Sequence, residues 1–446
     1  MTMNKKNNTF FSRSGWVVVM SLFLGFATVE AQITEKPQYG TFLIENVDIY
    51  PVTSDVIQGG VVVVKDGLIE YVGSNVKPDL TGDIIRIDGS GHRLYPGFID
   101  SETQLGLNEI GAVAVTIDAA EVGSVNPEMI AQTAINPGSV SIPVTRVDGV
   151  TNVVAAPVSG LVSGTGSLID LYGYTPEAMS IDQRAGIYIN WPSSGKRGWW
   201  DSRSEKEIEK DYNEAIDQIN ELFDDARAYH TMWQAIESDE LDAQPDVNAK
   251  MDAMRYLFTQ DARLVVRVNR EKDILAALEW ATQQDDLSFV FSGVSEGWRV
   301  ADKLADADIP VIATALVTPS RPSDHYARPY QNAGLMANAG VHVSLSTFNT
   351  ENVRNLPFHA GYAATYGMGV EEALKAVTIN PAEIWGVDDK LGSIDVGKHA
   401  NLILVDGDPF ETTSIIKDVF IRGYRIPMVS RHTQLNEEFL DRDATN

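Results

Sequence analysis

The stretch Leu94-Tyr-Pro-Gly-Phe-Ile-Asp100 decides the fold, because it separates two regions of the 446-residue chain that follow different sequence patterns. Before it, residues 41–93 contain short runs of alternating apolar and polar residues, such as Thr41-Phe-Leu-Ile-Glu-Asn-Val-Asp-Ile-Tyr50. This alternation predicts β-strands with one buried face, and the Asp66-Gly67 pair predicts a hairpin turn. After it, short apolar runs alternate with helical stretches. The junction therefore carries the chain from an all-β region into a mixed α/β region.

Two segments near the C-terminus repeat the strand pattern of residues 41–93. Ala400-Asn-Leu-Ile-Leu-Val-Asp-Gly407 and Asp418-Val-Phe-Ile-Arg-Gly423 are both short apolar runs that end in glycine. We expect them to close with the N-terminal strands into one composite β-sandwich, formed from residues 41–93 and 392–430. Residues 94–391 then form a domain of their own.

The middle region has the rhythm of a parallel sheet with helical crossovers. Over roughly 300 residues, a (β/α)₈ TIM-like barrel is the favoured closure of such an α/β pattern, and a doubly wound open sheet is the alternative. One helix is especially clear, because Ser204 and Glu207 make a capping box before apolar residues at helical spacing. The expected strands are 94–99, 152–155, 264–268, 288–291, 310–313 and 341–345.

The first 31 residues have the three parts of a secretory signal. Three cations precede an apolar run that begins at Trp16, and Val29-Glu-Ala31 places small residues at the −3 and −1 positions. The run is roughly 12 residues long, whereas a membrane span needs roughly 20, so an anchor is the weaker interpretation. We expect cleavage after Ala31 and a periplasmic or secreted protein. The absence of cysteine agrees with this, because stray thiols are oxidised in such compartments.

The chain is strongly acidic, with a formal net charge of −27. Its first 31 residues carry three positive charges and one negative charge, so the mature chain would carry −29. Such a surface repels nucleic acid and anionic lipid, so we expect neither as a partner and no membrane span after signal cleavage. Solubility is the plainer explanation of the charge, and a cationic partner is the alternative.

Three segments in chain order are more specific than composition. They are Leu94–Asp100, Val377-Thr-Ile-Asn-Pro-Ala-Glu-Ile-Trp-Gly386 and Leu391-Gly-Ser-Ile-Asp-Val-Gly-Lys-His399 with the strand that follows it. Together they resemble the amidohydrolase superfamily, in particular its imidazolonepropionase-like members. The resemblance implies a barrel with zinc or another divalent metal at its C-terminal mouth, where the metal activates water to hydrolyse a non-peptide carbon–nitrogen bond. It also implies a His-x-His pair after strand 1, Lys or His on strand 5, His on strand 6 and Asp on strand 8.

This chain has other residues at each of those ligand positions. Glu102 and Gln104 stand where the His-x-His pair is expected. Strand 5 ends at Asn269 with neither His nor Lys, and Gly293 takes the strand 6 position. Asn349 is the polar residue nearest to the strand 8 position, which Phe348 fills. We therefore expect no metal and no other cofactor at a pocket made from these residues.

Glu296 follows Gly293 and belongs with the same group of candidate pocket residues. An oxygen-rich site for Ca²⁺ or Mg²⁺, made by Glu102, Glu296, Asp324 and Asn349, is an alternative, because those ions prefer carboxylates and carbonyls. Scattered, solvated carboxylates are the plainer interpretation. Two histidines, His325 and His359, lie on segments that approach the mouth, and surface or packing roles are favoured for both.

The run Val158-Ser-Gly-Leu-Val-Ser-Gly-Thr-Gly-Ser167 is rich in glycine and serine. Such a run can cradle an anion with backbone N–H groups, but it lacks the lysine of a nucleotide loop. We expect a mobile loop over the barrel mouth, in which the candidate ligand contacts are Ser163, Gly164, Thr165 and Gly166.

These observations favour an exported amidohydrolase-like protein that is not catalytic and that binds a ligand or a partner. A divergent active hydrolase of amides or cyclic amides with a rebuilt site is the alternative. The expected partners are a small-molecule ligand, an active amidohydrolase homologue, or further copies of the same chain.

Overall fold

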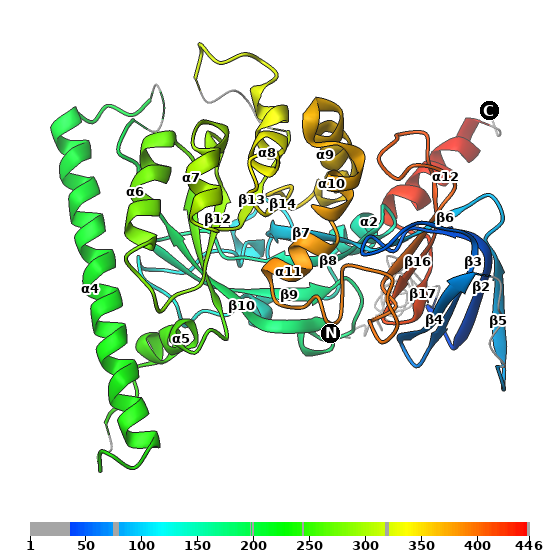
Figure 1. The fold of residues 1–446 in the computed structure, drawn as a ribbon, viewed down its shortest axis with the longest axis horizontal. Helices are drawn as coiled ribbons and strands as arrows, with labels where there is room; N and C mark the ends of the chain where they lie inside the picture. The colour runs from blue at the N-terminus through cyan, green and yellow to red at the C-terminus, as the bar shows by residue number, and fades with distance from the viewer. Residues whose placement is uncertain are drawn as a thin grey trace, which may run out of the picture. The chain divides into compact units, whose positions relative to one another are not determined.

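An eight-stranded sheet forms the centre of the fold (Figure 1). The computed structural model describes residues 36–74, 80–196, 198, 200–242, 245–316 and 321–443, so the expected signal segment and its cleavage site after Ala31 lie outside the described residues. The sheet order is β14-β13-β12-β11-β10-β9-β8-β7. Its strands are β7 (Phe98–Thr103), β8 (Val150–Ala155), β9 (Val162–Asp170), β10 (Ser180–Asn190), β11 (Arg263–Val268), β12 (Phe289–Gly293), β13 (Val311–Ala313) and β14 (Val343–Leu345).

The expected α/β class, a TIM-like barrel with a second sheet from both ends of the chain, is confirmed. One strand departs from the regular (β/α)₈ pattern, because β9 pairs antiparallel with both β8 and β10. The other strands all run in one direction. Strands β8, β9 and β10 follow each other with no long helix between them, and only α3 (Pro176–Met179) intervenes.

The interpretation of residues 158–167 as a mobile loop is wrong, because β9 begins at Val162 and every residue of it is buried. Its glycines have a packing reason. A Cβ added at Gly166 would lie 2.6 Å from the Tyr188 ring, and one at Gly164 would lie 2.8 Å from the Met129 carbonyl oxygen. Glycine inside a strand often marks such close approach, and here it gave the sequence the look of a loop.

The barrel closes through side chains where its two edge strands, β7 and β14, meet. The fully buried Asp100 on β7 accepts hydrogen bonds of 2.6 Å from the hydroxyls of Ser346 and Thr347, which directly follow β14. The Thr347 amide also donates to Asp100, at 3.2 Å. The Ser101 and Ser344 hydroxyls bond across the same seam. Asp100 therefore holds the two edges together where the sheet order has no strand ladder.

The helices pack around this sheet, and the longest, α4 (Glu205–Glu237), lies at the left of Figure 1. The predicted capping box at its start is confirmed: Ser204 N donates to Glu207 Oε2 at 2.7 Å, and Glu207 N donates to Ser204 Oγ at 3.3 Å. No helix among the described residues is long and apolar enough to cross a membrane. The other helices are α2 (Ser141–Arg146), α5 (Ala249–Phe258), α6 (Glu271–Ala281), α7 (Ala301–Asp306), α8 (Arg328–Asn338), α9 (Leu356–Ala363), α10 (Val370–Lys375), α11 (Ile379–Ile384) and α12 (Arg431–Asp443).

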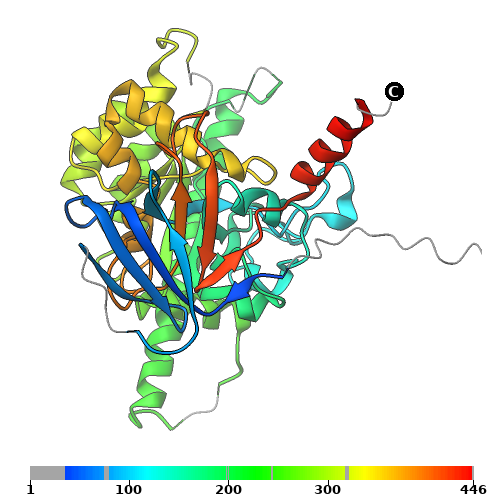
Figure 2. The same cartoon turned by 90° about the vertical axis from the view of Figure 1, so that its right-hand side faces the viewer.

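A nine-stranded second sheet combines both ends of the chain (Figure 2). Strand β6 pairs antiparallel with β15, and Phe42 meets Phe420 edge-on at 5.2 Å in the shared core. The strand expected at residues 94–99 is in fact two strands, because β6 joins this sheet and β7 begins the barrel. The strands are β1 (Gln38–Tyr39), β2 (Thr41–Ile49), β3 (Ile57–Lys65), β4 (Leu68–Ser74), β5 (Ile84–Asp88), β6 (Arg93–Pro96), β15 (Leu402–Val405), β16 (Ile416–Ile421) and β17 (Tyr424–Ile426).

A buried carboxylate joins the two sheets. Asp170, at the end of β9, accepts hydrogen bonds of 2.8 Å from Asn152 on β8 and from Asn401 beside β15. Arg422, in the turn between β16 and β17, forms an ion pair with the same carboxylate. These contacts connect the barrel to the second sheet at the end of the barrel opposite to the mouth.

Candidate functional site

The barrel mouth, where the parallel strands end, is where the active sites of (β/α)₈ barrels lie. Glu102 lies near the end of β7, and Arg267 lies near the end of β11. Their side chains are 8% and 15% exposed, respectively, so both charges are largely removed from water. An isolated charge would be costly in such surroundings, so their pairing decides the chemistry of the mouth.

Arg267 and Glu102 form the central ion pair of the mouth. Arg267 Nε donates to Glu102 Oε1 at 2.6 Å, and the Ser292 hydroxyl on β12 donates to the other carboxylate oxygen. The remaining guanidinium nitrogens donate to Ser163 Oγ at 3.2 Å and to the Pro157 carbonyl oxygen at 2.7 Å. The guanidinium also lies over the Tyr188 ring, 4.5 Å from its centroid. One cation thus contacts residues of β7, β9 and β10 and the end of β8.

These residues do not fit a divalent metal. The guanidinium holds the carboxylate Glu102 that would have to bind the ion, and it brings positive charge to the same place. At the strand 6 position, Gly293 has φ +90°, and a Cβ there would lie 2.7 Å from Asn269 Oδ1. A histidine at this position would therefore collide with its neighbour. Within the described parts of the chain, no three His, Cys, Asp or Glu side chains are placed to hold a metal ion.

The structure separates the remaining predicted pocket residues. Glu296 accepts hydrogen bonds of 2.9 Å from Arg321 and one of 2.8 Å from the Glu271 amide at the start of α6. The Arg321 guanidinium helps to hold the pKa of Glu296 below its usual range, against the burial that raises it. Asp324 pairs with another arginine, Arg299.

The predicted amides at the mouth have local roles. Asn349 Oδ1 accepts from the amides of Thr350 at 2.9 Å and Asn352 at 3.1 Å, which shapes the turn after β14. Asn269 Oδ1 accepts from the Ser295 hydroxyl at 2.7 Å. Gln104 donates its backbone N–H to the Asn349 carbonyl oxygen at 3.4 Å. The alternative of an oxygen-rich Ca²⁺ or Mg²⁺ pocket is therefore wrong, because Glu102, Glu296 and Asp324 each pair with a different arginine.

Of the two histidines on segments that approach the mouth, His359 is a packing residue and His325 lies at the surface. His359 on α9 is buried and lies 2.9 Å from the Thr314 hydroxyl, directly after β13. Burial lowers its pKa to about 4, so it is neutral at physiological pH. His325 Nδ1 accepts from the Ala327 amide at 3.2 Å, and its ring packs on Tyr326.

Of the four glycine-rich candidates, Ser163 reaches the mouth, through its contact with Arg267. Thr165 donates to the Pro127 carbonyl oxygen at 2.9 Å, on the outer side of β9. A hollow of about 170 Å³ lies beside Ser163 and Pro157, under the segment that carries Asp118 and Met129. This volume is smaller than the ~300–1,000 Å³ of common small-molecule sites.

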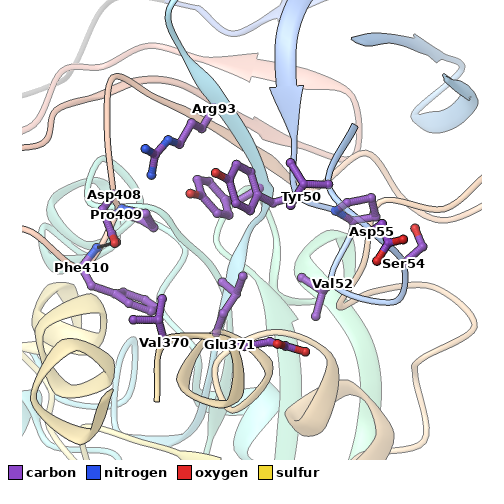
Figure 3. A pocket seen from close by; sticks show the side chains of 14 residues that line it. Tyr50, Val52, Ser54, Asp55, Arg93, Val370, Glu371, Asp408, Pro409 and Phe410 are labelled. Carbon is purple, nitrogen blue, oxygen red and sulfur yellow. Dashed lines mark hydrogen bonds between the residues drawn. The ribbon is translucent and has the colours of Figure 1, made fainter. Parts of the chain in front are cut away.

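A larger cavity, of about 460 Å³, lies between the second sheet and α10 (Figure 3). The rings of Tyr50 and Tyr95 stack there at 4.5 Å, and the Arg93 guanidinium lies 5.7 Å from the Tyr50 centroid. Asp55 and Asp408 lie on opposite sides of the rings. No histidine is among the described residues that line this cavity, and its carboxylates Asp55, Glu371 and Asp408 come from three separate segments.

Comparison with known proteins places the chain in a family. A family model described as the amidohydrolase family matches residues 323–426. A solved amidohydrolase from Thermotoga maritima MSB8 is 25% identical, with a TM-score of 0.74 that covers 86% of this chain and 99% of that one. The chain belongs to the amidohydrolase superfamily.

Curated members of the superfamily match only part of this chain. An imidazolonepropionase from Shouchella clausii is 41% identical over 85 residues, which is 18% of this chain and 19% of that protein. An N-substituted formamide deformylase from Arthrobacter pascens is 32% identical over 127 residues, or 28% of this chain and 21% of that protein. The chain thus matches about a fifth of the length of these relatives. A prolidase structure with bound N-methylphosphonate-L-proline, at 16% identity and TM-score 0.54 over 86% of this chain and 99% of that one, shows the shared fold alone.

Two residues of the mouth were missed from the sequence, Arg267 and Asp100. A charged residue inside the apolar run Leu264-Val-Val-Arg-Val268 was the available signal, because a buried arginine requires a partner. In the sequence, Asp100 stands out only as the last residue of the junction motif Leu94–Asp100. Its role depends on Ser346 and Thr347, which lie 246 and 247 residues away.

Proposed function

We propose that this chain is a non-catalytic member of the amidohydrolase superfamily that acts by binding a partner. The Glu102–Arg267 ion pair carries the proposal, because a guanidinium fixed to the chain occupies the centre of the mouth, where the family pattern expects residues that bind a metal ion. Metal-dependent hydrolysis needs an ion that lowers the pKa of a bound water and an open position for the substrate. The donor set of this mouth provides neither.

The small hollow beside Ser163 favours a partner over a large substrate in the mouth. At about 170 Å³ it has little room for an amide with substituents on both sides of the bond. The chain as a whole carries a formal net charge of −27, so its outer surface offers a large acidic area for a partner. We therefore assign the binding function to surfaces of the protein outside the barrel.

A divergent hydrolase is the competing function. Its best candidate for a general base is Asp100, because burial raises the pKa of this carboxyl to about 6. However, Asp100 is fully buried, and the hydroxyls of Ser346 and Thr347 hydrogen-bond to its oxygens. A base must reach the proton that it takes, directly or through one water. Asp100 closes the barrel seam instead.

The test combines metal analysis with turnover. The purified chain is incubated with and without zinc and assayed on an imidazolone, an N-substituted formamide and an N-acyl amino acid. The imidazolonepropionase from Shouchella clausii serves as the positive control. We expect no stoichiometric metal and no turnover above buffer. Stoichiometric zinc, iron or manganese, or turnover that Glu102→Gln abolishes, would refute the proposal.

Export is a separate proposal, which rests on the signal-like residues 1–31. We expect the mature protein to begin at Gln32 and to appear in the periplasmic fraction or the medium. N-terminal sequencing of the protein from fractionated cells checks this. A cytoplasmic protein that still carries Lys5 and Arg13 would contradict it.

A further inference from the structure

Helix α12 extends from the rest of the chain with an unpartnered apolar face. It begins after Ser430, whose hydroxyl accepts from the Thr433 amide at 3.3 Å, and it contacts α2. Figure 2 shows the helix projecting away from the barrel and the second sheet. Among residues 431–442 every side chain is exposed except that of Thr433, which is half-buried. An isolated helix of this length is marginal in water, so α12 needs a surface to pack on.

The sequence of α12 is amphipathic. Leu435 and Phe439 lie one turn apart on one side, next to Leu440, and they are 36%, 58% and 66% exposed. The opposite side is acidic. At 1.5 Å per residue, the thirteen residues reach about 20 Å, so Phe439 lies roughly 12 Å beyond the start of the helix.

A partly apolar groove lies at the base of the same helix, and Asp148, Arg354 and Glu411 are among the residues that line it. It has a volume of about 440 Å³, and Thr433 of α12 forms part of its wall. Phe358 on α9, Ile415 and Met428 contribute apolar surface, and Ile415 is 56% exposed. The chain therefore carries an amphipathic helix and a partly apolar groove side by side, and the helix points away from its own groove.

Charge along α12 is also self-complementary. The helix starts with Arg431 and His432, and Glu437, Glu438 and Asp441 follow toward the C-terminal end. Arg442 lies at that end too and pairs with Glu438, so Glu437 and Asp441 carry the remaining negative charge there. Two copies related by a two-fold axis perpendicular to the helix run antiparallel, which places the acidic part of each helix beside the basic start of the other. A two-fold interface needs this kind of patch, one that complements itself.

We propose that two copies of this chain form a dimer by exchanging α12, so that Phe439 and Leu440 of each copy pack in the groove beside Ile415 of the other. The two contacts are equivalent, and both apolar faces become buried. This interface does not depend on whether the barrel is catalytic, so it stands or fails apart from the proposed function.

A lipid surface is a poorer binding partner for α12 than a second copy of the chain. Helices that lie on membranes carry lysine and arginine on the polar face, whereas Glu437, Glu438 and Asp441 are acidic. The net charge of −27 adds repulsion from anionic headgroups.

Light scattering coupled to gel filtration tests the exchange on the full-length mature chain. We expect twice the monomer mass for wild type at micromolar concentration. Phe439→Ser with Leu440→Ser, and separately Ile415→Glu, should each give the monomer mass with an unchanged circular dichroism spectrum. Val122→Ser is the matched control, because Val122 is 89% exposed elsewhere on the chain, and it should leave the dimer intact.

Mixing the two variants adds a sharper test. The helix variant keeps an intact groove and the Ile415→Glu variant keeps an intact helix, so an equal mixture should form a heterodimer joined by one contact. A monomeric wild type overturns the proposal. So does a dimer that both variants leave intact, or a wild type that sediments with anionic phosphatidylglycerol vesicles through α12.

Discussion

Removing either partner of the Glu102–Arg267 pair should be costly, while removing both should cost much less than the sum. Glu102→Gln keeps the shape and the oxygen that faces Ser292 but leaves the guanidinium without a counter-charge. Arg267→Met keeps much of the volume but leaves a buried carboxylate. Leaving one charge of a buried pair uncompensated typically costs about 3–5 kcal/mol, so we expect each single variant to lose roughly 3 kcal/mol of unfolding free energy.

The coupling follows from the geometry of the pair. Its 2.6 Å contact places the charge centres roughly 4 Å apart, which corresponds to about 4 kcal/mol at an effective dielectric constant of ~20. The double variant Glu102→Gln/Arg267→Met removes both charges together. We expect a coupling energy of about 2–4 kcal/mol in the double-mutant cycle, because neither remaining group is then an unpaired ion.

Urea unfolding, followed by circular dichroism and tryptophan fluorescence together, measures the cycle. Arg227 and Asp286 supply a matched control, since the same Nε-to-carboxylate contact of 2.7 Å occurs there with side chains 30% and 43% exposed. An exposed pair contributes at most about 1 kcal/mol. If the Glu102–Arg267 cycle gives a coupling as small as the control, the guanidinium does not carry the role that we assign to it.

Three further predictions use the same unfolding assay. Folding raises the pKa of Asp100 from 3.8 to about 6, so protonated Asp100 contributes its full stabilisation below pH 3.8. About 3 kcal/mol of unfolding free energy is then lost as the pH rises through 6. Asp100→Asn should remove this pH dependence, and a variant with an unchanged pH profile would contradict the prediction. Gly293→Ala should lower the unfolding free energy by about 1–3 kcal/mol, because the backbone has φ +90° there and the new Cβ would lie 2.7 Å from Asn269 Oδ1. Adding Asn269→Gly to this variant should remove the clash with the side chain but leave the backbone strain. Ser204→Ala should cost about 1 kcal/mol through loss of the cap on Glu207, and no loss would show that α4 is held by packing alone.

The parts of the fold that could be predicted from the sequence are those set by residues close together in the chain. Alternating strands at both ends predicted the composite sheet, which the pairing of Leu94 with Leu404 confirms. The capping box at Ser204 depends on residues three positions apart, so it was also visible. Strand β9 was missed because Gly164 and Gly166 meet neighbouring chain segments, and a single sequence shows the glycine but not the neighbour.

The candidate site was harder to predict, because its partners are distant in sequence. Glu102 was predicted as a pocket residue, and in the structure it lies near the end of β7 and pairs with Arg267, 165 residues later. Strand 5 carries neither the lysine nor the histidine of the family pattern, and its arginine is not a residue that this pattern predicts as a ligand. Absence of a ligand is readable from one sequence, whereas the group that replaces it becomes evident only when the strands are brought together.

If the chain is non-catalytic, as we propose, the Arg267 guanidinium explains how the barrel keeps its form without a metal. A metal at the mouth of such a barrel ties the ends of several strands to one positive charge. Arg267 does the same here, since it contacts Glu102 from β7, Ser163 from β9 and the Pro157 carbonyl after β8. A covalently attached cation cannot exchange, and its N–H donors cannot activate water as a Lewis acid does. Under the proposed function, the guanidinium therefore preserves the structural part of the metal's role and gives up the chemical part.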